Sequence, residues 1–176
     1  MKMENNLFDL SGKIALVTGG AGLLGSEHAI ALASHGAKVY LADINEEKCQ
    51  DKAAKIDFDE IYPIKLDVTS KENWQEVVSK IVEKEGSLVN NAGYTNSTKT
   101  SAFDKTFENF SLDDWNSIMN VNLTGTFLGC QTVGNQMIKQ KKGSIINIAS
   151  LYGVVSPNHK MYPGTGIVQP VAYTVS

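Results

Sequence analysis

Three glycines followed by a carboxylate at a set distance are the residues of this chain that most clearly could do chemistry. Gly19, Gly22 and Gly25 come after a β-rich run, Ile14–Thr18, and before a helical pattern. Glycine there permits a tight turn and lets backbone N–H groups approach a pyrophosphate at the start of a helix. Asp43 ends the next β-rich run, 18 residues after Gly25, where a carboxylate can bind a ribose 2′-hydroxyl. The spacing favours a dinucleotide site over a turn that merely needs small residues.

The chain ends in Ala172, Tyr173, Thr174, Val175 and Ser176, and a tyrosine phenol is a group that can transfer a proton. A tyrosine phenol has an ordinary pKa of about 10, so it is a poor base at neutral pH unless a nearby cation stabilises the phenolate. The sequence therefore gives Tyr173 the right functional group but leaves its activation to its surroundings.

Apolar runs alternate with helical patterns along the chain, which predicts βαβ units on a parallel sheet. Asn45 caps one expected helix, and the pairs Thr69/Glu72 and Ser111/Asp114 have the spacing that opens two others. The predicted fold class is α/β, a three-layer doubly wound parallel sheet of the Rossmann type, in a single domain over residues 1–176. The expected strands are 14–18, 38–43, 61–66, a short one within 86–90, and 144–149; the expected helices are 23–35, 45–56, 69–85 and 111–140.

The blocks TGGAGLLG at residues 18–25 and NNAG at residues 90–93, with the late tyrosine, resemble the short-chain dehydrogenase/reductase family along nearly the whole chain. The resemblance implies that hydride passes between a nicotinamide cofactor and a secondary alcohol or ketone. It makes Tyr173 the general acid/base, places Ser150 on the substrate oxygen, and gives Asn122 a water of the proton relay. Taken alone, an asparagine in a helix is more often a solvated surface residue.

The same resemblance assigns a cofactor site. Asp67, after the third strand, would bind the adenine ring, although a turn or cap aspartate is an equally good reading without the family. Asp43 would repel a 2′-phosphate, which favours NAD over NADP. Leu23 departs from the NNAG-bearing branch, which usually has glycine there. The expected cofactor-binding residues are Gly19, Gly22, Leu23, Leu24, Gly25, Asp43, Asp67, Asn91, Ala92 and Gly93, with Asn91 tying the fourth strand to its neighbours.

Three features depart from the family pattern. The lysine of its Tyr-x-x-x-Lys motif would be residue 177, so we expect the motif and the last strands to be cut off at Ser176 and this chain to be catalytically impaired. The fourth strand is left only about three residues, short against a usual length of roughly five or six. The run 151–170 is a long insertion, read either as a surface loop or as a substrate-recognition segment using His159, Lys160 and Tyr162. It resembles inserts of surface-glycan and flagellin-modification reductases, which favours a sugar-derived substrate.

Composition excludes several other classes. A net charge of −3 argues against nucleic-acid binding, and no apolar run approaches a membrane span. The N-terminus has no signal-peptide pattern, so we expect a cytoplasmic protein. Cys49 and Cys130 are expected to be free thiols, and the histidines have no metal-ligand spacing, so no metal is expected. Two alternative functions stay open, a 3-oxoacyl carrier-protein reductase and a non-catalytic dinucleotide-binding remnant; the parent protein is expected to be a homo-oligomer.

Overall fold

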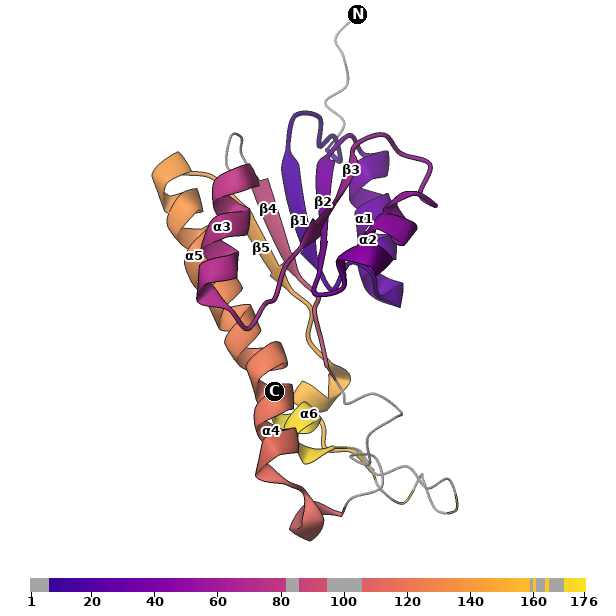
Figure 1. The fold of residues 1–176 in the computed structure, drawn as a ribbon, viewed down its shortest axis with the longest axis vertical. Helices are drawn as coiled ribbons and strands as arrows, with labels where there is room; N and C mark the ends of the chain where they lie inside the picture. The colour runs from indigo at the N-terminus through magenta and orange to yellow at the C-terminus, as the bar shows by residue number, and fades with distance from the viewer. Residues whose placement is uncertain (1–6, 82–85, 95–105, 159, 161–163, 165–169) are drawn as a thin grey trace, which may run out of the picture.

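A five-stranded parallel sheet forms the centre of the molecule (Figure 1). The computed structural model describes residues 7–81, 86–94, 106–158, 160, 164 and 170–176. The strand order is β3-β2-β1-β4-β5, so the predicted doubly wound α/β fold is confirmed. The strands are β1 (Ile14–Thr18), β2 (Lys38–Asp43), β3 (Ile61–Lys65), β4 (Gly86–Asn90) and β5 (Ser144–Asn147).

Helices cover both faces of the sheet and complete three layers. On one face, α1 (Leu23–Ser34) and α2 (Glu46–Ala53) enclose a core that includes Val17, Val39 and Leu41. On the other face, α3 (Lys71–Ile81) and α5 (Thr126–Gln140) pack on alternate residues of the same strands. Successive strand side chains point to opposite faces, so β1 supplies both cores. The sheet is thereby held rigidly, and its carboxyl ends can position polar groups.

The expected helix over residues 111–140 is one long rod with a change of pitch. It consists of α4 (Leu112–Met119), the π-helical segment η3 (Asn120–Gly125) and α5. Ser111 caps it as predicted, because its Oγ accepts the backbone N–H of Asp114 at 3.1 Å. The rod runs past the carboxyl end of the sheet, where α4 packs against the short helix α6 (Val171–Val175) (Figure 1). Single-turn π segments inside α-helices are frequent at functional sites.

Some local predictions are wrong: β5 ends at Asn147 rather than at residue 149, α2 ends at Ala53 rather than at residue 56, and two further differences have a clear structural reason. The fourth strand has five residues rather than three, because Gly86 and Ser87 also pair with β1, opposite Ile14 and Ala15. The cap of α3 is Ser70 rather than Thr69: Ser70 Oγ accepts the backbone N–H of Asn73 at 3.1 Å. The Thr69 hydroxyl instead donates a hydrogen bond to the Asp67 carboxylate, as described below.

The insertion after Ser150 is described only in part. It begins with a 3₁₀ turn, η4 (Leu151–Gly153), and Lys160 is exposed. His159 and Tyr162, the other candidates for substrate recognition in this segment, lie outside the described residues. Within the part of the chain that the structure describes, no helix is both long and apolar enough to cross a membrane.

Candidate cofactor and active site

A cavity of about 480 Å³ opens at the carboxyl ends of the strands. Parallel strands of an open α/β sheet present their ligand-binding loops at this edge. Five of the predicted cofactor residues line the cavity, although they come from four different strand ends: Gly19, Asp43, Asp67, Ala92 and Gly93. Leu66, Val68, Tyr94, Ser117, Asn120 and Val121 complete much of the wall.

The glycine turn is packed too closely to accept side chains. Gly19 has φ +62°, and a Cβ there would lie 2.8 Å from Cα of Ala92. A Cβ on Gly25 would collide with the carbonyl oxygen of Gly19. Gly22 closes the turn by donating its N–H to that same carbonyl at 3.0 Å. The backbone itself is therefore the surface that the turn offers to the cavity.

Leu23 and Leu24 begin α1 with their side chains in solvent, 78% and 57% exposed. This exposure explains why leucine is accommodated at a position where the family often has glycine. The first N–H groups of a helix have no intrahelical partner and carry its positive dipole end. Gly22 provides no side-chain cap for them. These N–H groups are thus suited to a pyrophosphate.

Asp43 is fixed beside the glycine turn at the end of β2. Its Oδ2 accepts the backbone N–H of Ala21 at 3.3 Å, and its Oδ1 accepts that of Asn45 at 3.0 Å. Behind it, burial and the charge of Asp43 raise the pKa of the Cys49 thiol to about 12. Cys49 donates to the carbonyl oxygen of Leu41 at 3.2 Å. The thiol stays neutral, so Asp43 brings the negative charge to this end of the cavity.

Thr18 joins the glycine turn to the NNAG segment, a role that was missed in the sequence. The hydroxyl of this buried residue accepts the backbone N–H groups of Asn91 and Ala92 at 3.0 and 2.9 Å. In the other direction, the Asn91 side-chain amide donates a hydrogen bond to the carbonyl oxygen of Thr18 at 3.0 Å. A threonine that ends a strand just before the glycines was the available signal. The junction aligns the ends of β1 and β4 on one side of the cavity.

Asp67 follows β3, the strand next to β2, and lines the same cavity. Its Oδ1 accepts both the backbone N–H and the hydroxyl of Thr69, at 2.9 and 2.7 Å. Its carbonyl oxygen accepts the N–H of Ser70 at 3.1 Å. The carboxylate is therefore oriented by its own turn before any ligand enters.

The three expected catalytic residues are brought into one region beyond the sheet. Asn122, in η3, uses its side-chain amide to grip the backbone of Tyr94: Oδ1 accepts the N–H at 2.7 Å, and Nδ2 donates to the carbonyl at 3.2 Å. The same Nδ2 donates to Ser176 Oγ at 3.0 Å, just past the helix that carries Tyr173. Ser150 Oγ accepts the N–H of Tyr152 at 3.2 Å, which starts η4. The helix α6 contacts η4, so Tyr173 and Ser150 lie on neighbouring elements.

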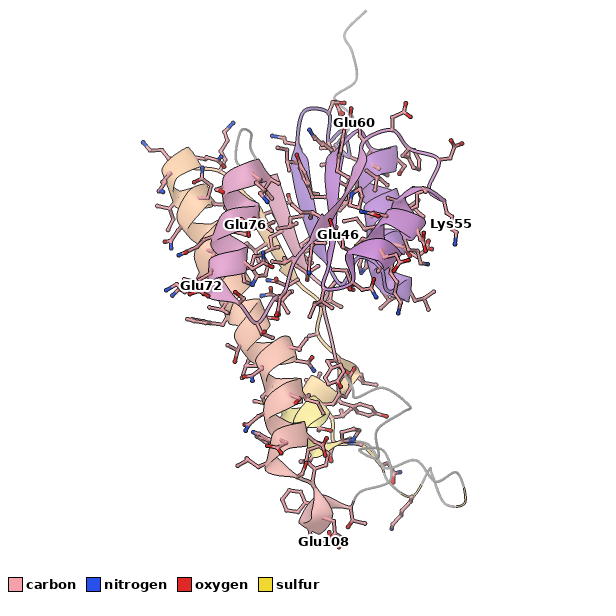
Figure 2. The ribbon with its side chains drawn as sticks, in the orientation of Figure 1. Glu46, Lys55, Glu60, Glu72, Glu76 and Glu108 are labelled. Atoms are coloured by element: carbon pink, nitrogen blue, oxygen red, sulfur yellow. The ribbon has the colours of Figure 1, made fainter. Side chains whose placement is uncertain are left out.

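Charged side chains give no sign of a second centre. Within the described ranges, no three His, Cys, Asp or Glu side chains are grouped so that they could hold a metal ion. Figure 2 shows labelled acidic side chains spread over three elements: Glu46 on α2, Glu72 and Glu76 on α3, and Glu108 in the turn η2 (Phe107–Asn109).

Comparisons with known proteins agree with this geometry. The short chain dehydrogenase family matches residues 13–165. A 3-alpha-(or 20-beta)-hydroxysteroid dehydrogenase of Mycobacterium bovis is 40% identical over 148 residues, which are 82% of this chain and 54% of that protein. The 3-oxoacyl-[acyl-carrier-protein] reductase FabG of Thermotoga maritima is 37% identical over 82% of this chain and 58% of its own length.

Solved structures give the same result. The crystal structure of gox2181 has a TM-score of 0.80 and 27% identity, over 95% of this chain and 62% of that one. A candidate gluconate dehydrogenase from Agrobacterium tumefaciens has a TM-score of 0.79 and 27% identity, over 96% of this chain and 62% of its own. The chain thus spans little more than half the length of the curated relatives it matches. From its glycine turn, its NNAG segment and these matches, the chain belongs to the short-chain dehydrogenase/reductase family.

Proposed function

We propose that this protein transfers hydride between NAD(H) and a secondary alcohol or ketone. The observation that carries the proposal is the convergence of five predicted cofactor residues, from four strand ends, on one cavity of about 480 Å³. The relatives named as dehydrogenases and reductases support the reaction type. Because the chain covers only part of their length, the activity is proposed for the whole protein.

The cavity fits an adenine dinucleotide on chemical grounds. The glycine turn excludes side chains and offers backbone N–H groups, as a pyrophosphate requires. Asp43 accepts a ribose hydroxyl at the end of β2, and Asp67 follows the neighbouring strand β3 and lines the same cavity, where the adenine ring would lie. The bound cofactor supplies the hydride chemistry, and the protein supplies its position.

Asp43 sets the preference for NAD(H) over NADP(H). At about 4 Å and an effective dielectric constant of about 20, two like unit charges repel by roughly 4 kcal/mol. A quarter of that energy already gives about five-fold discrimination. Residues 19–26 contain no basic side chain that would offset the repulsion of a 2′-phosphate.

The proton is moved by the polar groups beyond the sheet. Tyr173 donates it to, or takes it from, the substrate oxygen, and Ser150 holds that oxygen by a hydrogen bond. Asn122 holds the backbone of Tyr94, the residue after NNAG, through two hydrogen bonds, and we assign it to the proton path. The contact between α6 and η4 supports this assignment, because it brings the elements of Tyr173 and Ser150 together.

The substrate that we propose is polar and sugar-derived. The insertion that follows Ser150 carries the exposed Lys160, and a similar solved structure is a candidate gluconate dehydrogenase. Curated relatives named for steroids, a chlorinated diol and an acyl-carrier-protein substrate are comparably similar, so identity alone selects no substrate. The similarity to FabG supports 3-oxoacyl carrier-protein reduction as the second candidate function.

The test is reduction of NAD⁺ by the whole protein with a panel of sugar acids, sugar alcohols and cyclic alcohols, and oxidation of NADH with a 3-oxoacyl thioester. We expect turnover with a sugar-derived alcohol, and a loss of about 10²–10⁴-fold in kcat in Tyr173→Phe. Tyr62→Phe, at an exposed position of β3 outside the cavity lining, is the matched control and keeps its rate. Undiminished turnover in Tyr173→Phe would assign the proton to another group, and preference for the thioester would establish the second candidate.

A further inference from the structure

Two consecutive residues of α3 hold the backbone that carries Asp67. The Oδ1 atom of Asn73 accepts the backbone N–H of Asp67 at 2.7 Å. The indole Nε1 of Trp74 donates to the carbonyl oxygen of Val68 at 2.9 Å. Both Asp67 and Val68 line the cavity. These two hydrogen bonds therefore hold Asp67 and Val68 against α3.

The grip of Asn73 is separate from helix capping. Ser70 Oγ accepts the backbone N–H of Asn73 at 3.1 Å and so satisfies the helix start by itself. The Asn73 side chain reaches back six residues instead, to a strand end. Trp74 is fully buried, which fixes the rotation of α3 against the sheet. The packing of α3 therefore holds the Asn73 side chain next to Asp67.

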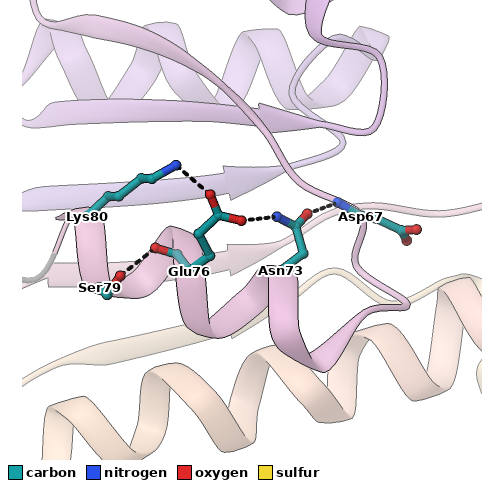
Figure 3. A network of polar contacts seen from close by, with 5 residues as sticks. All are labelled: Asp67, Asn73, Glu76, Ser79 and Lys80. Atoms are coloured by element: carbon teal, nitrogen blue, oxygen red, sulfur yellow. Dashed lines mark hydrogen bonds and ion pairs between the residues drawn. The ribbon is translucent and has the colours of Figure 1, made fainter.

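A polar network decides which way the Asn73 amide points (Figure 3). Its Nδ2 faces Glu76 Oε2 at 3.4 Å, and Glu76 Oε1 pairs with Lys80 Nζ at 2.7 Å. Hydrogen bonds from Lys80 and Asn73 lower the pKa of the Glu76 carboxyl, so Glu76 is ionised and can only accept. The amide nitrogen must then face Glu76, which leaves the amide oxygen for the N–H of Asp67.

The Asp67 carboxylate has one oxygen left for a ligand. Thr69 occupies Oδ1 with two donors, whereas Oδ2 accepts no hydrogen bond from any described residue. A small shift of the Asp67 backbone would move Oδ2 relative to the cavity. The alignment of Oδ2 with an amine N–H of a bound ligand depends on where the Asp67 backbone lies, because hydrogen bonds weaken steeply when donor and acceptor are misaligned.

We propose that Asn73 is a positioning residue for the adenine half of the cofactor, acting through the backbone of Asp67. Asn73 touches no reacting atom and lies at the wall behind the site. The inference rests on the proposed function, since it needs an adenine nucleotide in the cavity. It goes beyond that function by assigning part of the adenine affinity to a helix residue outside the cavity lining.

The test separates the two halves of the cofactor. The whole protein is titrated with NAD⁺, with ADP-ribose as the adenine half, and with nicotinamide mononucleotide as the other half. Asn73→Ala should weaken NAD⁺ and ADP-ribose about five-fold, the order of one hydrogen bond, and leave nicotinamide mononucleotide unchanged. Asn73→Asp combined with Glu76→Gln keeps an acceptor for the N–H of Asp67 without placing two carboxylates beside each other, and should restore most of the affinity. Gln75→Ala, at an exposed position two residues further along the same helix, is the control and should change nothing.

Alanine suits a helix, so Asn73→Ala is expected to fold, and its thermal unfolding is recorded beside the wild type. Equal losses for both halves, an unchanged Asn73→Ala variant, or no recovery in the double variant Asn73→Asp, Glu76→Gln would each overturn the inference. Failure of the wild type to bind either adenine ligand would instead overturn the proposed function. The two failures are therefore distinguishable in one set of titrations.

Discussion

Asp43 combines a structural and a recognition role in one carboxylate. It fixes the glycine turn through Ala21 and faces the cavity with its charge. Asp43→Asn keeps an oxygen acceptor but removes the charge. We expect this variant to bind NAD⁺ about three- to ten-fold more weakly, because a hydrogen bond to a charged acceptor is the stronger kind, and to lose its discrimination against NADP⁺. Calorimetric titration with both cofactors measures this, with Asp51→Asn on the exposed side of α2 as control. Persistent discrimination in Asp43→Asn would place the selectivity elsewhere.

The two cysteines should differ sharply in reactivity. Burial and the charge of Asp43 raise the pKa of Cys49 to about 12, from 9.0, whereas Cys130 is partly exposed. At pH 8 a disulfide reagent such as dithionitrobenzoate should modify Cys130 alone, and both thiols only after unfolding, because the thiolate is the nucleophile. Since the folded pKa is the higher one, the Cys49 contribution to stability is complete below about pH 9 and is lost as the pH rises toward about 12. Rapid modification of Cys49 in the native protein would contradict this account.

At the scale of elements, the long helix lies close to the sheet only because it carries glycine where it crosses α3. A Cβ on Gly129 would lie 2.8 Å from ring atoms of Trp74 and 2.7 Å from Asn90 Oδ1. Gly129→Ala should therefore destabilise the fold by about 1–3 kcal/mol through overpacking, despite the better helix propensity of alanine. On the same helix, a Cβ on Gly134 would meet its nearest atom only at 4.0 Å, so Gly134→Ala should be neutral or stabilising by up to about 1 kcal/mol. Urea unfolding of the pair tests the packing; equal effects would refute it.

Elements were predictable where a local signal was strong. The bounds of β1 and β2 follow from compact β-rich runs, and Ser111 caps its helix as its spacing indicates. Local signals failed where a partner outside the element determines the bounds of that element. Gly86 and Ser87 are weak strand formers that pairing with β1 draws into β4. Both Thr69 and Ser70 are good caps, and Asp67 settles the choice by taking the hydroxyl of Thr69.

Part of the cavity lining was predictable from the sequence, but the contacts that hold it were not. Gly19, Asp43 and Asp67 could be named because motif and strand ends mark them. The bonds that fix the site join residues far apart in the chain: Thr18 to Asn91, and Asn122 to Tyr94. Such pairs depend on how the strands and the long helix are placed, which one sequence does not reveal.

At the scale of the whole molecule, part of one sheet face near β5 is exposed among the described residues. In the described residues β5 is an edge strand, and Ile146 and Ile148 are 46% and 42% exposed. Ile146 pairs with Val89, which belongs to the core beneath α1, so this apolar strip lies on the α1 side of the sheet. An exposed apolar edge favours association. We expect the 176-residue chain to self-associate, and the double variant Ile146→Thr, Ile148→Thr to reduce its mass by light scattering. Ile138→Thr, on the long helix, is the control; if it alone dissociated the chain, the helix would be the interface instead.

The central claim is that the cavity at the carboxyl ends of the strands binds NAD(H) through the glycine turn and Asp43. Its most direct test is a calorimetric titration of the wild-type chain with NAD⁺ and with NADP⁺ under identical conditions. The account predicts saturable binding of both at one site, with NAD⁺ at least about five-fold tighter. Tighter binding of NADP⁺, or no binding of either cofactor by the folded chain, would contradict it.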